Sequence, residues 1–290
     1  MKKLSRVLVL LLVLCTLISC APQEKTMKDF FVDADYVVKN LDKIVLIDAR
    51  DPEVKKEGLV KGSVPVAWQD LAKVDVAPGE DGWGHILEAD KLATVLAEKG
   101  IDKDKEVVIF SNMDQGWGED GRIFWVLEAA GYKNLKLLSG GFEKIKDKLE
   151  IVEEIDKVEP VEVKIEKLDT SNSIKTEELS TKLKDYTIID CRETNEFEGE
   201  ANFGEARGGR IPGAKNLPFS TLFKDGDLKS EEELKKLCEE AGLSKDKEAV
   251  VYCTGGIRAA YVQVITKMLG YKTVNYEGGY YRWCTEHDVE

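Results

Sequence analysis

An internal duplication constrains the fold of this chain more than any other feature of its sequence. An apolar run ends in Asp-x-Arg twice, at Asp48 in IVLIDARDPEV and at Asp190 in TIIDCRETNEF, 142 residues apart. Four further pairs of segments follow in the same order: GSVPVA at Gly62 and GRIPGA at Gly209, EVVIFS at Glu106 and EAVVYC at Glu248, AGY and LGY ending at Tyr132 and Tyr271, and Gly-Gly at Gly140 and Gly278. Five ordered landmarks indicate two copies of one domain.

Each copy alternates short apolar runs with amphipathic helical stretches. In the second copy we expect strands at residues 187–190, 249–253 and 273–276. Wholly apolar strands separated by helices predict a parallel sheet with helices on both faces, an α/β fold.

Two helices of the second copy carry end signals. Ser230 and Glu233 form a capping box before an apolar stripe, and Gly270 follows the second helix as a stop signal. The acidic stretch 149–173 contains Pro160 and is expected to link the copies, with a β-like segment at 161–168.

The N-terminus has the features of a targeting signal. Basic residues precede an apolar run, Val7–Leu14, that is shorter than the ~20 residues of a membrane-spanning helix. The sequence Leu-Ile-Ser-Cys ending at Cys20 resembles the cleavage box of bacterial lipoproteins. We expect a signal peptide at 1–19, lipid attachment to Cys20, and a tether at 20–27. The domain would then be held at the cell envelope, on the extracytoplasmic side of a membrane, through its lipid alone. An ordinary secretory signal and a core helix containing a cysteine are the alternatives.

The charge balance excludes some classes of partner. The chain has 42 Lys and Arg against 55 Asp and Glu, a net charge of -13. An acidic protein lacks the basic footprint that nucleic-acid binding and docking on anionic lipid require. A small anionic substrate stays compatible with this charge, because a local pocket can oppose the net field.

The cysteines beyond the leader show no metal-binding spacing. There is no Cys-x2-Cys, and the only histidines are His85 and His287, so we expect neither a metal nor a cofactor. An exported protein can form disulfides, but the spacing predicts no pairing. The cysteines concerned are Cys191, Cys238, Cys253 and Cys284.

Cys253 is the candidate nucleophile. It ends a predicted buried strand and begins a loop that leads into a helix: Cys253, Thr254, Gly255, Gly256, Ile257 and Arg258. Paired glycines let such a loop aim successive backbone N–H groups at one point, and the helix N-terminus and Arg258 add positive charge. These features would stabilise a thiolate and hold an incoming anion, so we expect Cys253 to be catalytic and the rest of the loop to bind substrate. The alternative is a buried structural cysteine.

Several other residues have two interpretations each. Asp190 and Arg192 would orient the loop or form a structural ion pair, the latter being favoured because Asp48 and Arg50 repeat the pattern.

Arg207 and Arg210 would extend a positive pocket or lie at the surface. Trp83, His85 and Trp117 would line a cleft between the copies or pack their interface. Cys191 and Cys284 would be structural, or would resolve an oxidised or sulfur-bearing Cys253 if they approach it.

The motifs of the second copy resemble the tandem rhodaneses, the thiosulfate and 3-mercaptopyruvate sulfurtransferase family. They are IIDCRE, ARGGRIPGAKNLPF, CTGGIRA and NYEGGYYRW. The resemblance covers about residues 28–290 and implies a five-stranded parallel sheet flanked by helices in each unit. It implies a catalytically silent N-terminal unit at 28–150, a linker at 151–173 and a catalytic C-terminal unit at 174–290. The N-terminal unit has Ser111 at the cysteine position, and a hydroxyl cannot form a persulfide.

The same resemblance implies the chemistry. Cys253 would take a sulfane sulfur from a small anionic donor as a persulfide, and pass it to cyanide, a thiol or an acceptor protein. The loop resembles that of many bacterial rhodaneses, with Arg258 as its only base, and favours thiosulfate over mercaptopyruvate as the donor. One rival is a phosphatase or arsenate reductase, whose loops place five residues between Cys and Arg where this chain has four. The other is a membrane-tethered persulfide carrier or redox partner.

Overall fold

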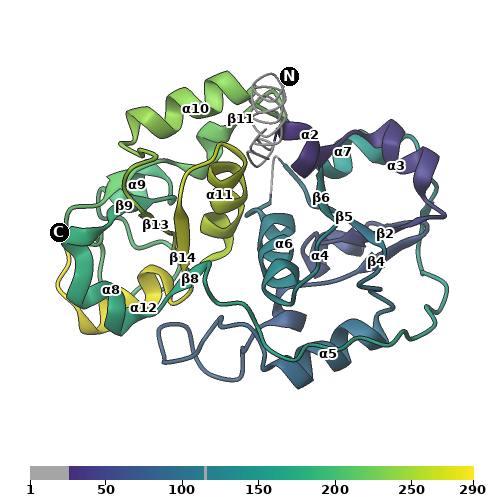
Figure 1. Ribbon diagram of the computed structural model, residues 1–290, viewed down its shortest axis with the longest axis horizontal. Helices are drawn as coiled ribbons and strands as arrows, with labels where there is room; N and C mark the ends of the chain where they lie inside the picture. The colour runs from purple at the N-terminus through teal and green to yellow at the C-terminus, as the bar shows by residue number, and fades with distance from the viewer. Residues whose placement is uncertain (1–25, 114–115) are drawn as a thin grey trace, which may run out of the picture.

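The computed structural model describes residues 26–113 and 116–290 (Figure 1). The expected signal peptide at 1–19, the lipidation site Cys20 and nearly all of the tether lie outside the described residues. Within these ranges, none of the helices combines the length and the apolar character that crossing a membrane requires.

The N-terminal unit contains a five-stranded sheet in which all neighbouring strands are parallel. In spatial order the strands are β1 (Phe31–Val32), β6 (Leu135–Leu138), β5 (Glu106–Phe110), β2 (Ile44–Asp48) and β4 (Ser63–Pro65). Alternate residues of β2 and β5 point to two apolar clusters, one on each face of the sheet. The helices α3 (Ala34–Asn40) and α7 (Gly141–Ile145) cover one face, and α2 (Met27–Phe30), α5 (Ala89–Glu98) and α6 (Glu119–Ala129) cover the other.

The C-terminal unit repeats this arrangement strand for strand. Its parallel sheet has the order β8 (Ser173–Ile174), β14 (Thr273–Tyr276), β13 (Ala249–Tyr252), β9 (Thr187–Asp190) and β10 (Lys215–Asn216). Helices α8 (Thr176–Lys182) and α12 (Gly279–Glu286) cover one face, and α10 (Glu231–Glu240) and α11 (Ile257–Met268) cover the other. The predicted α/β fold, with a five-stranded parallel sheet flanked by helices in each unit, is confirmed.

Shorter elements connect these layers. They are α4 (Pro52–Lys55), β3 (Leu59–Val60), η1 (Trp68–Leu71), β7 (Ile151–Val152), η2 (Leu183–Asp185), α9 (Thr194–Phe197), η3 (Phe219–Leu222), β11 (Phe223–Lys224) and β12 (Asp227–Leu228). Two antiparallel pairs, β3 with β7 and β11 with β12, lie outside the main sheets.

The sequence signals of the C-terminal unit act as predicted. The Ser230 side chain accepts a hydrogen bond from the Glu233 N–H at 3.3 Å, and Glu233 caps the Ser230 N–H at 3.1 Å, so α10 begins with a capping box. Gly270 follows α11 with a φ of 77°, a conformation that glycine adopts without strain.

The segment 161–168 is not a strand, contrary to our expectation. It runs as irregular chain beside α5, where the Val161 N–H donates to the Ala97 carbonyl at 3.0 Å. Its alternating apolar residues Val163, Ile165 and Leu168 are half-buried against the core. The period-two pattern therefore comes from packing over a helix and not from pairing within a sheet.

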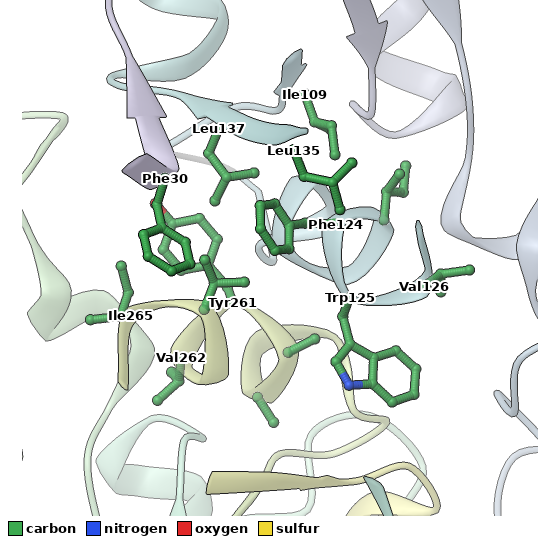
Figure 2. Close-up of a cluster of buried hydrophobic side chains, with 14 of the residues drawn as sticks. Phe30, Ile109, Phe124, Trp125, Val126, Leu135, Leu137, Tyr261, Val262 and Ile265 are labelled. Carbon is green, nitrogen blue, oxygen red and sulfur yellow. The ribbon is translucent and has the colours of Figure 1, made fainter. Parts of the chain in front are cut away.

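The two units share one hydrophobic core. Helices α6 and α11 lie side by side between the sheets and contact each other (Figure 1). Figure 2 shows Phe124 and Trp125 of α6 beside Tyr261 and Val262 of α11. At Gly121 the helices approach so closely that a Cβ atom would lie 2.5 Å from Tyr261 Cα. A single continuous core fixes the position of one unit against the other.

The variant Gly121→Ala tests this contact. Alanine is the better helix former by about 1 kcal/mol, so an exposed helix would gain stability from the change. We expect the opposite here, because the new methyl group meets the backbone of α11. Thermal unfolding should show a lower melting temperature than the parent chain. An unchanged or higher melting temperature would contradict close packing of α6 on α11.

Candidate active site

The loop that contains Cys253 lies at the carboxyl edge of the C-terminal sheet, between β13 and α11. The Gly256 N–H donates to the Cys253 sulfur at 3.1 Å. Gly256 is the N-cap of α11 and has a φ of 81°, which its lack of a side chain permits. The sulfur therefore lies against the positive end of a 12-residue helix, and a backbone N–H group points at it.

Backbone groups of α12 hold the first half of this loop. The Tyr280 and Tyr281 N–H groups donate to the carbonyls of Cys253 and Thr254 at 2.8 and 3.0 Å. Gly279 has a φ of 58°, and a Cβ atom there would lie 2.5 Å from the Thr254 carbonyl oxygen. Glycine is thus required at position 279 for α12 to begin directly beneath the nucleophile.

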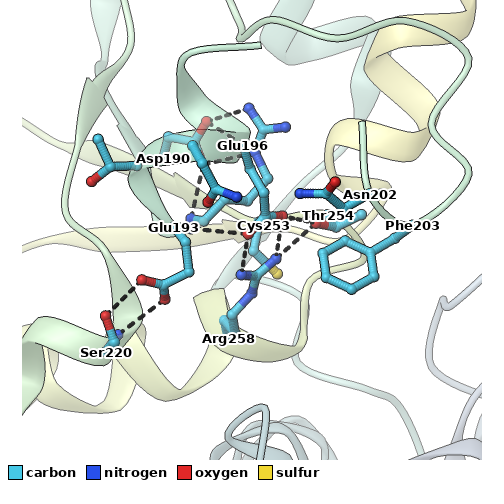
Figure 3. Close-up of polar contacts among 12 residues, drawn as sticks. Asp190, Glu193, Glu196, Asn202, Phe203, Ser220, Cys253, Thr254 and Arg258 are labelled. Carbon is cyan, nitrogen blue, oxygen red and sulfur yellow. Dashed lines mark hydrogen bonds and ion pairs between the residues drawn. The ribbon is translucent and has the colours of Figure 1, made fainter. Parts of the chain in front are cut away.

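Arg258 holds the second half of the loop. Its guanidinium donates two hydrogen bonds to the Glu196 carboxylate, at 2.6 and 2.8 Å, and one to the Thr254 hydroxyl at 2.8 Å (Figure 3). Both charged side chains are at least 97% buried, with 3% of Arg258 and 2% of Glu196 exposed. Burial raises the pKa of Glu196, but the hydrogen bonds and charge of Arg258 outweigh it and lower that pKa. The residue expected to bind substrate therefore gives its hydrogen bonds to protein groups, although it lines the pocket.

Asp190 and Arg192 lie behind the loop and not in the pocket. They form a fully buried ion pair at 2.6 Å, and Arg192 also donates to the Gly209 carbonyl at 2.7 Å. In the N-terminal unit Arg50 pairs with Asp48 at 2.7 Å and donates to the Gly58 carbonyl. The two units therefore share the Asp–Arg pair and its carbonyl partner, and in the C-terminal unit the Tyr252 hydroxyl also donates to Asp190 at 2.5 Å.

Arg207 and Arg210 do not extend the pocket, so that alternative is wrong. Arg207 donates to the Cys284 carbonyl at 2.7 Å, at the end of α12. Arg210 pairs with Glu290 at 2.9 Å and packs over the Phe197 ring. Both cations are engaged in holding the C-terminal end of the chain.

A pocket of about 260 Å³ opens above the Cys253 sulfur, and both units contribute to it. Its walls are mainly aromatic: Trp68, Trp83, Trp117, Phe203 and Tyr281. Trp83 and Trp117 lie at the pocket, as one of our interpretations had it, whereas His85 is not among the lining residues. Trp68 and Phe203 stand in segments with no recognisable pattern, so sequence reasoning missed them.

Arg122 is another residue that the sequence did not indicate. It belongs to α6 of the N-terminal unit, is fully buried, and donates to the Gly84 carbonyl. A Cβ atom on Gly256 would lie 3.4 Å from its Nη1 atom. Burial lowers the pKa of Arg122, and the nearby Glu277 and Cys253 oppose this. The N-terminal unit thus places a buried cation beneath the active loop.

The corresponding loop of the N-terminal unit is filled by its own side chain. Ser111 replaces the cysteine, and its hydroxyl donates to the Glu119 carboxylate at 2.9 Å. The Trp117 N–H donates to the same oxygen at 2.9 Å. Burial is the main cause that raises the pKa of Glu119. A carboxyl group therefore occupies the loop that could otherwise receive an anion.

The other cysteines of the described chain are buried and free. Burial, and after it the neighbouring Cys253, raises the pKa of Cys191. The Cys284 thiol donates to the Tyr281 carbonyl within α12. This environment suits the structural interpretation of both residues.

Comparison with known proteins gives consistent matches over both units. Residues 33–148 and 175–286 each match the Rhodanese-like domain family. The "Sulfur carrier protein TtuD" of Thermus thermophilus is 26% identical over 88% of this chain and 93% of its own length. A "Putative thiosulfate sulfurtransferase" of Mycolicibacterium smegmatis is 30% identical over 87% and 93%. The 3-mercaptopyruvate sulfurtransferase structure SseA from Escherichia coli superposes with a TM-score of 0.75, at 25% identity over 86% of this chain and 98% of that one.

A double-mutant cycle on Arg258 and Glu196 tests how the loop is held. Removing one partner of a buried ion pair leaves the other charge unpaired and costs about 3–5 kcal/mol. We therefore expect Arg258→Met and Glu196→Met each to be strongly destabilising in urea unfolding, and the double variant to lose far less than the sum.

The control for this cycle is the exposed pair Lys182–Glu178 at 2.8 Å in the same unit. Its removal should cost about 0–1 kcal/mol. Additive losses at Arg258 and Glu196 would show that the two side chains do not depend on each other.

Proposed function

This chain belongs to the rhodanese family, and from that premise we propose that it is a sulfurtransferase working through a persulfide on Cys253. The observation that carries the proposal is the position of the Cys253 sulfur. It accepts the Gly256 N–H at the start of α11 and lies at the base of the pocket between the units. A thiolate stabilised in this way is a nucleophile for a sulfur atom.

The first half-reaction loads the cysteine. The Cys253 thiolate attacks the outer sulfur of thiosulfate and forms a new S–S bond. The bond between the two sulfurs of thiosulfate breaks, and its electron pair leaves with sulfite. Backbone N–H groups at the start of α11 stabilise the anionic groups, as helix N-termini do.

The second half-reaction discharges the cysteine. A nucleophile such as cyanide or a thiolate attacks the outer sulfur of the persulfide. The S–S bond to Cys253 breaks and returns its electron pair to the cysteine as a thiolate. The products are thiocyanate or a new persulfide, and no net oxidant or reductant is consumed.

We propose thiosulfate as the donor, supported by a loop in which Arg258 is the single base and by the name of the Mycolicibacterium relative. Mercaptopyruvate is the alternative donor, supported by the likeness to SseA. A second candidate function is that of a persulfide carrier with a dedicated protein acceptor, supported by the name of the Thermus relative. Both functions use Cys253.

The location of the protein is part of the same proposal. We propose lipid attachment at Cys20 and a place on the outer side of a membrane. The basic start, the short apolar run and the Leu-Ile-Ser-Cys box support it. Labelling with a radioactive fatty acid, lost in Cys20→Ser, would test the anchor.

Intact mass spectrometry tests the persulfide. After exposure to thiosulfate, the purified chain should gain the mass of one sulfur atom, and cyanide should remove it. Cys253→Ser should gain nothing while keeping its fold, because a hydroxyl cannot form the persulfide. Gain with mercaptopyruvate alone would change the donor. Gain by Cys253→Ser would end the proposal.

Two matched glycine variants test whether loop geometry controls this chemistry. Gly279 and Gly141 have φ values of 58° and 56° and lie against the carbonyls of the active and silent loops. We expect Gly279→Ala and Gly141→Ala both to destabilise the fold. Only Gly279→Ala should slow persulfide formation at temperatures where both variants are folded. Equal slowing in the two variants would show that general destabilisation, and not loop position, is responsible.

A further inference from the structure

We propose that the pocket above Cys253 selects an acceptor thiol that carries a positively charged ammonium group. The inference rests on the proposed persulfide chemistry and adds the class of molecule that removes the sulfur. Three observations carry it: the arrangement of the aromatic rings, the carboxylates around them, and the engagement of the pocket's arginine by protein groups.

Three aromatic rings form a wall beside the nucleophile. Trp83 meets Trp68 at 5.9 Å and 76°, and it meets Tyr281 at 5.3 Å and 86°. The Trp83 ring also lies on the active loop, because a Cβ atom on Gly255 would be 2.8 Å from its Cζ3 atom. Edge-to-face packing is common between aromatic rings, and the faces of rings that line a pocket attract ammonium groups through cation–π contacts.

Carboxylates surround the same pocket. Asp51 and Glu119 are among its lining residues, and Asp51 is exposed at the N-cap of α4. Glu205 is not a lining residue, but its carboxylate accepts the backbone N–H of the lining residue Phe203 at 2.8 Å. The net charge of -13 on the whole chain favours the approach of a cation, and the two lining carboxylates lie at the pocket itself, whereas the buried cation Arg122 lies beneath the loop.

The one cation among the described lining residues is already paired. Arg258 is neutralised by Glu196, and its guanidinium lies 5.0 Å from the Trp117 ring centre and 6.0 Å from that of Phe203. Trp117 and Phe203 therefore already make a cation–π contact with Arg258. Among the described residues, Trp68, Trp83 and Tyr281 make no cation–π contact. An anionic thiol would find no free positive side chain in this pocket.

The consequence for the reaction concerns its second half. The thiolate of an ammonium thiol attacks the outer sulfur of the Cys253 persulfide while its cationic end lies against the three rings. The persulfide S–S bond breaks, Cys253 regains its electron pair, and the acceptor leaves as a persulfide. The anionic donor is held by backbone N–H groups instead, so donor and acceptor are recognised by different parts of one pocket.

Discharge rates with two thiols of opposite charge test this inference. The purified chain is loaded with thiosulfate or mercaptopyruvate, freed of donor, and treated with thiocholine or 3-mercaptopropionate. Loss of the added sulfur is followed by intact mass spectrometry. The ratio of the two rates is compared between the parent chain and each variant, which cancels the intrinsic reactivity of the thiols.

The variants are chosen to remove one ring or one charge. Trp83→Leu and Asp51→Asn should each lower the thiocholine to mercaptopropionate ratio, by roughly threefold to thirtyfold for the ring. Asp42→Asn is the matched control, because it removes the same charge from an exposed residue at the opposite end of β2. Its ratio should equal that of the parent chain.

The outcomes separate this inference from the proposed function. Failure of both donors to load Cys253 would overturn the two together. Loading followed by a ratio that is the same in Trp83→Leu, Asp51→Asn, Asp42→Asn and the parent chain would overturn the ammonium preference alone. A thiocholine to mercaptopropionate ratio that rises in Trp83→Leu and Asp51→Asn would show that the pocket selects anions.

Discussion

The shape of the six-residue loop from Cys253 to Arg258 depends on contacts from outside the loop. The loop turns the Gly256 N–H toward the Cys253 sulfur, and its buried carbonyls need donors of their own. The N-terminal N–H groups of α12 supply them at one end, and Glu196 receives the guanidinium at the other. The Gly-Gly turn lets α12 begin where its N–H groups reach these carbonyls. The Glu196 carboxylate on α9 holds Arg258, and both charged side chains are buried.

The two copies show what that scaffold does with and without a nucleophile. In both, an Asp–Arg pair braces the end of the second strand and a glycine brings a helix beneath the loop. In the N-terminal copy the carboxylate of Glu119 takes the hydrogen bonds of the loop. The two sheets keep the same strand order although the chain between strand and helix is longer in the N-terminal copy, where β5 ends at Phe110 and α6 begins at Glu119.

Sequence reasoning succeeded where the signal is local. The strands and the helix cap at Ser230 follow from short patterns, and the loop at Cys253 follows from six adjacent residues. It failed where partners are distant: Glu196 is 62 residues from Arg258, and Arg122 comes from the other copy. Segment 161–168 was wrongly predicted to be β-like. Its side chains alternate between half-buried and exposed because the segment packs over a helix, and this alternation has the same period as a strand.

Part of the pocket wall belongs to one copy and the nucleophile to the other. This division affects how the sequence of such a protein can diverge. Trp68 and Trp83 belong to the copy without Cys253, so a substitution at Trp68 changes the pocket wall without replacing a residue of the active loop, whereas Trp83 also packs against Gly255 of that loop. One inherited reaction can in this way be offered to a succession of different metabolites.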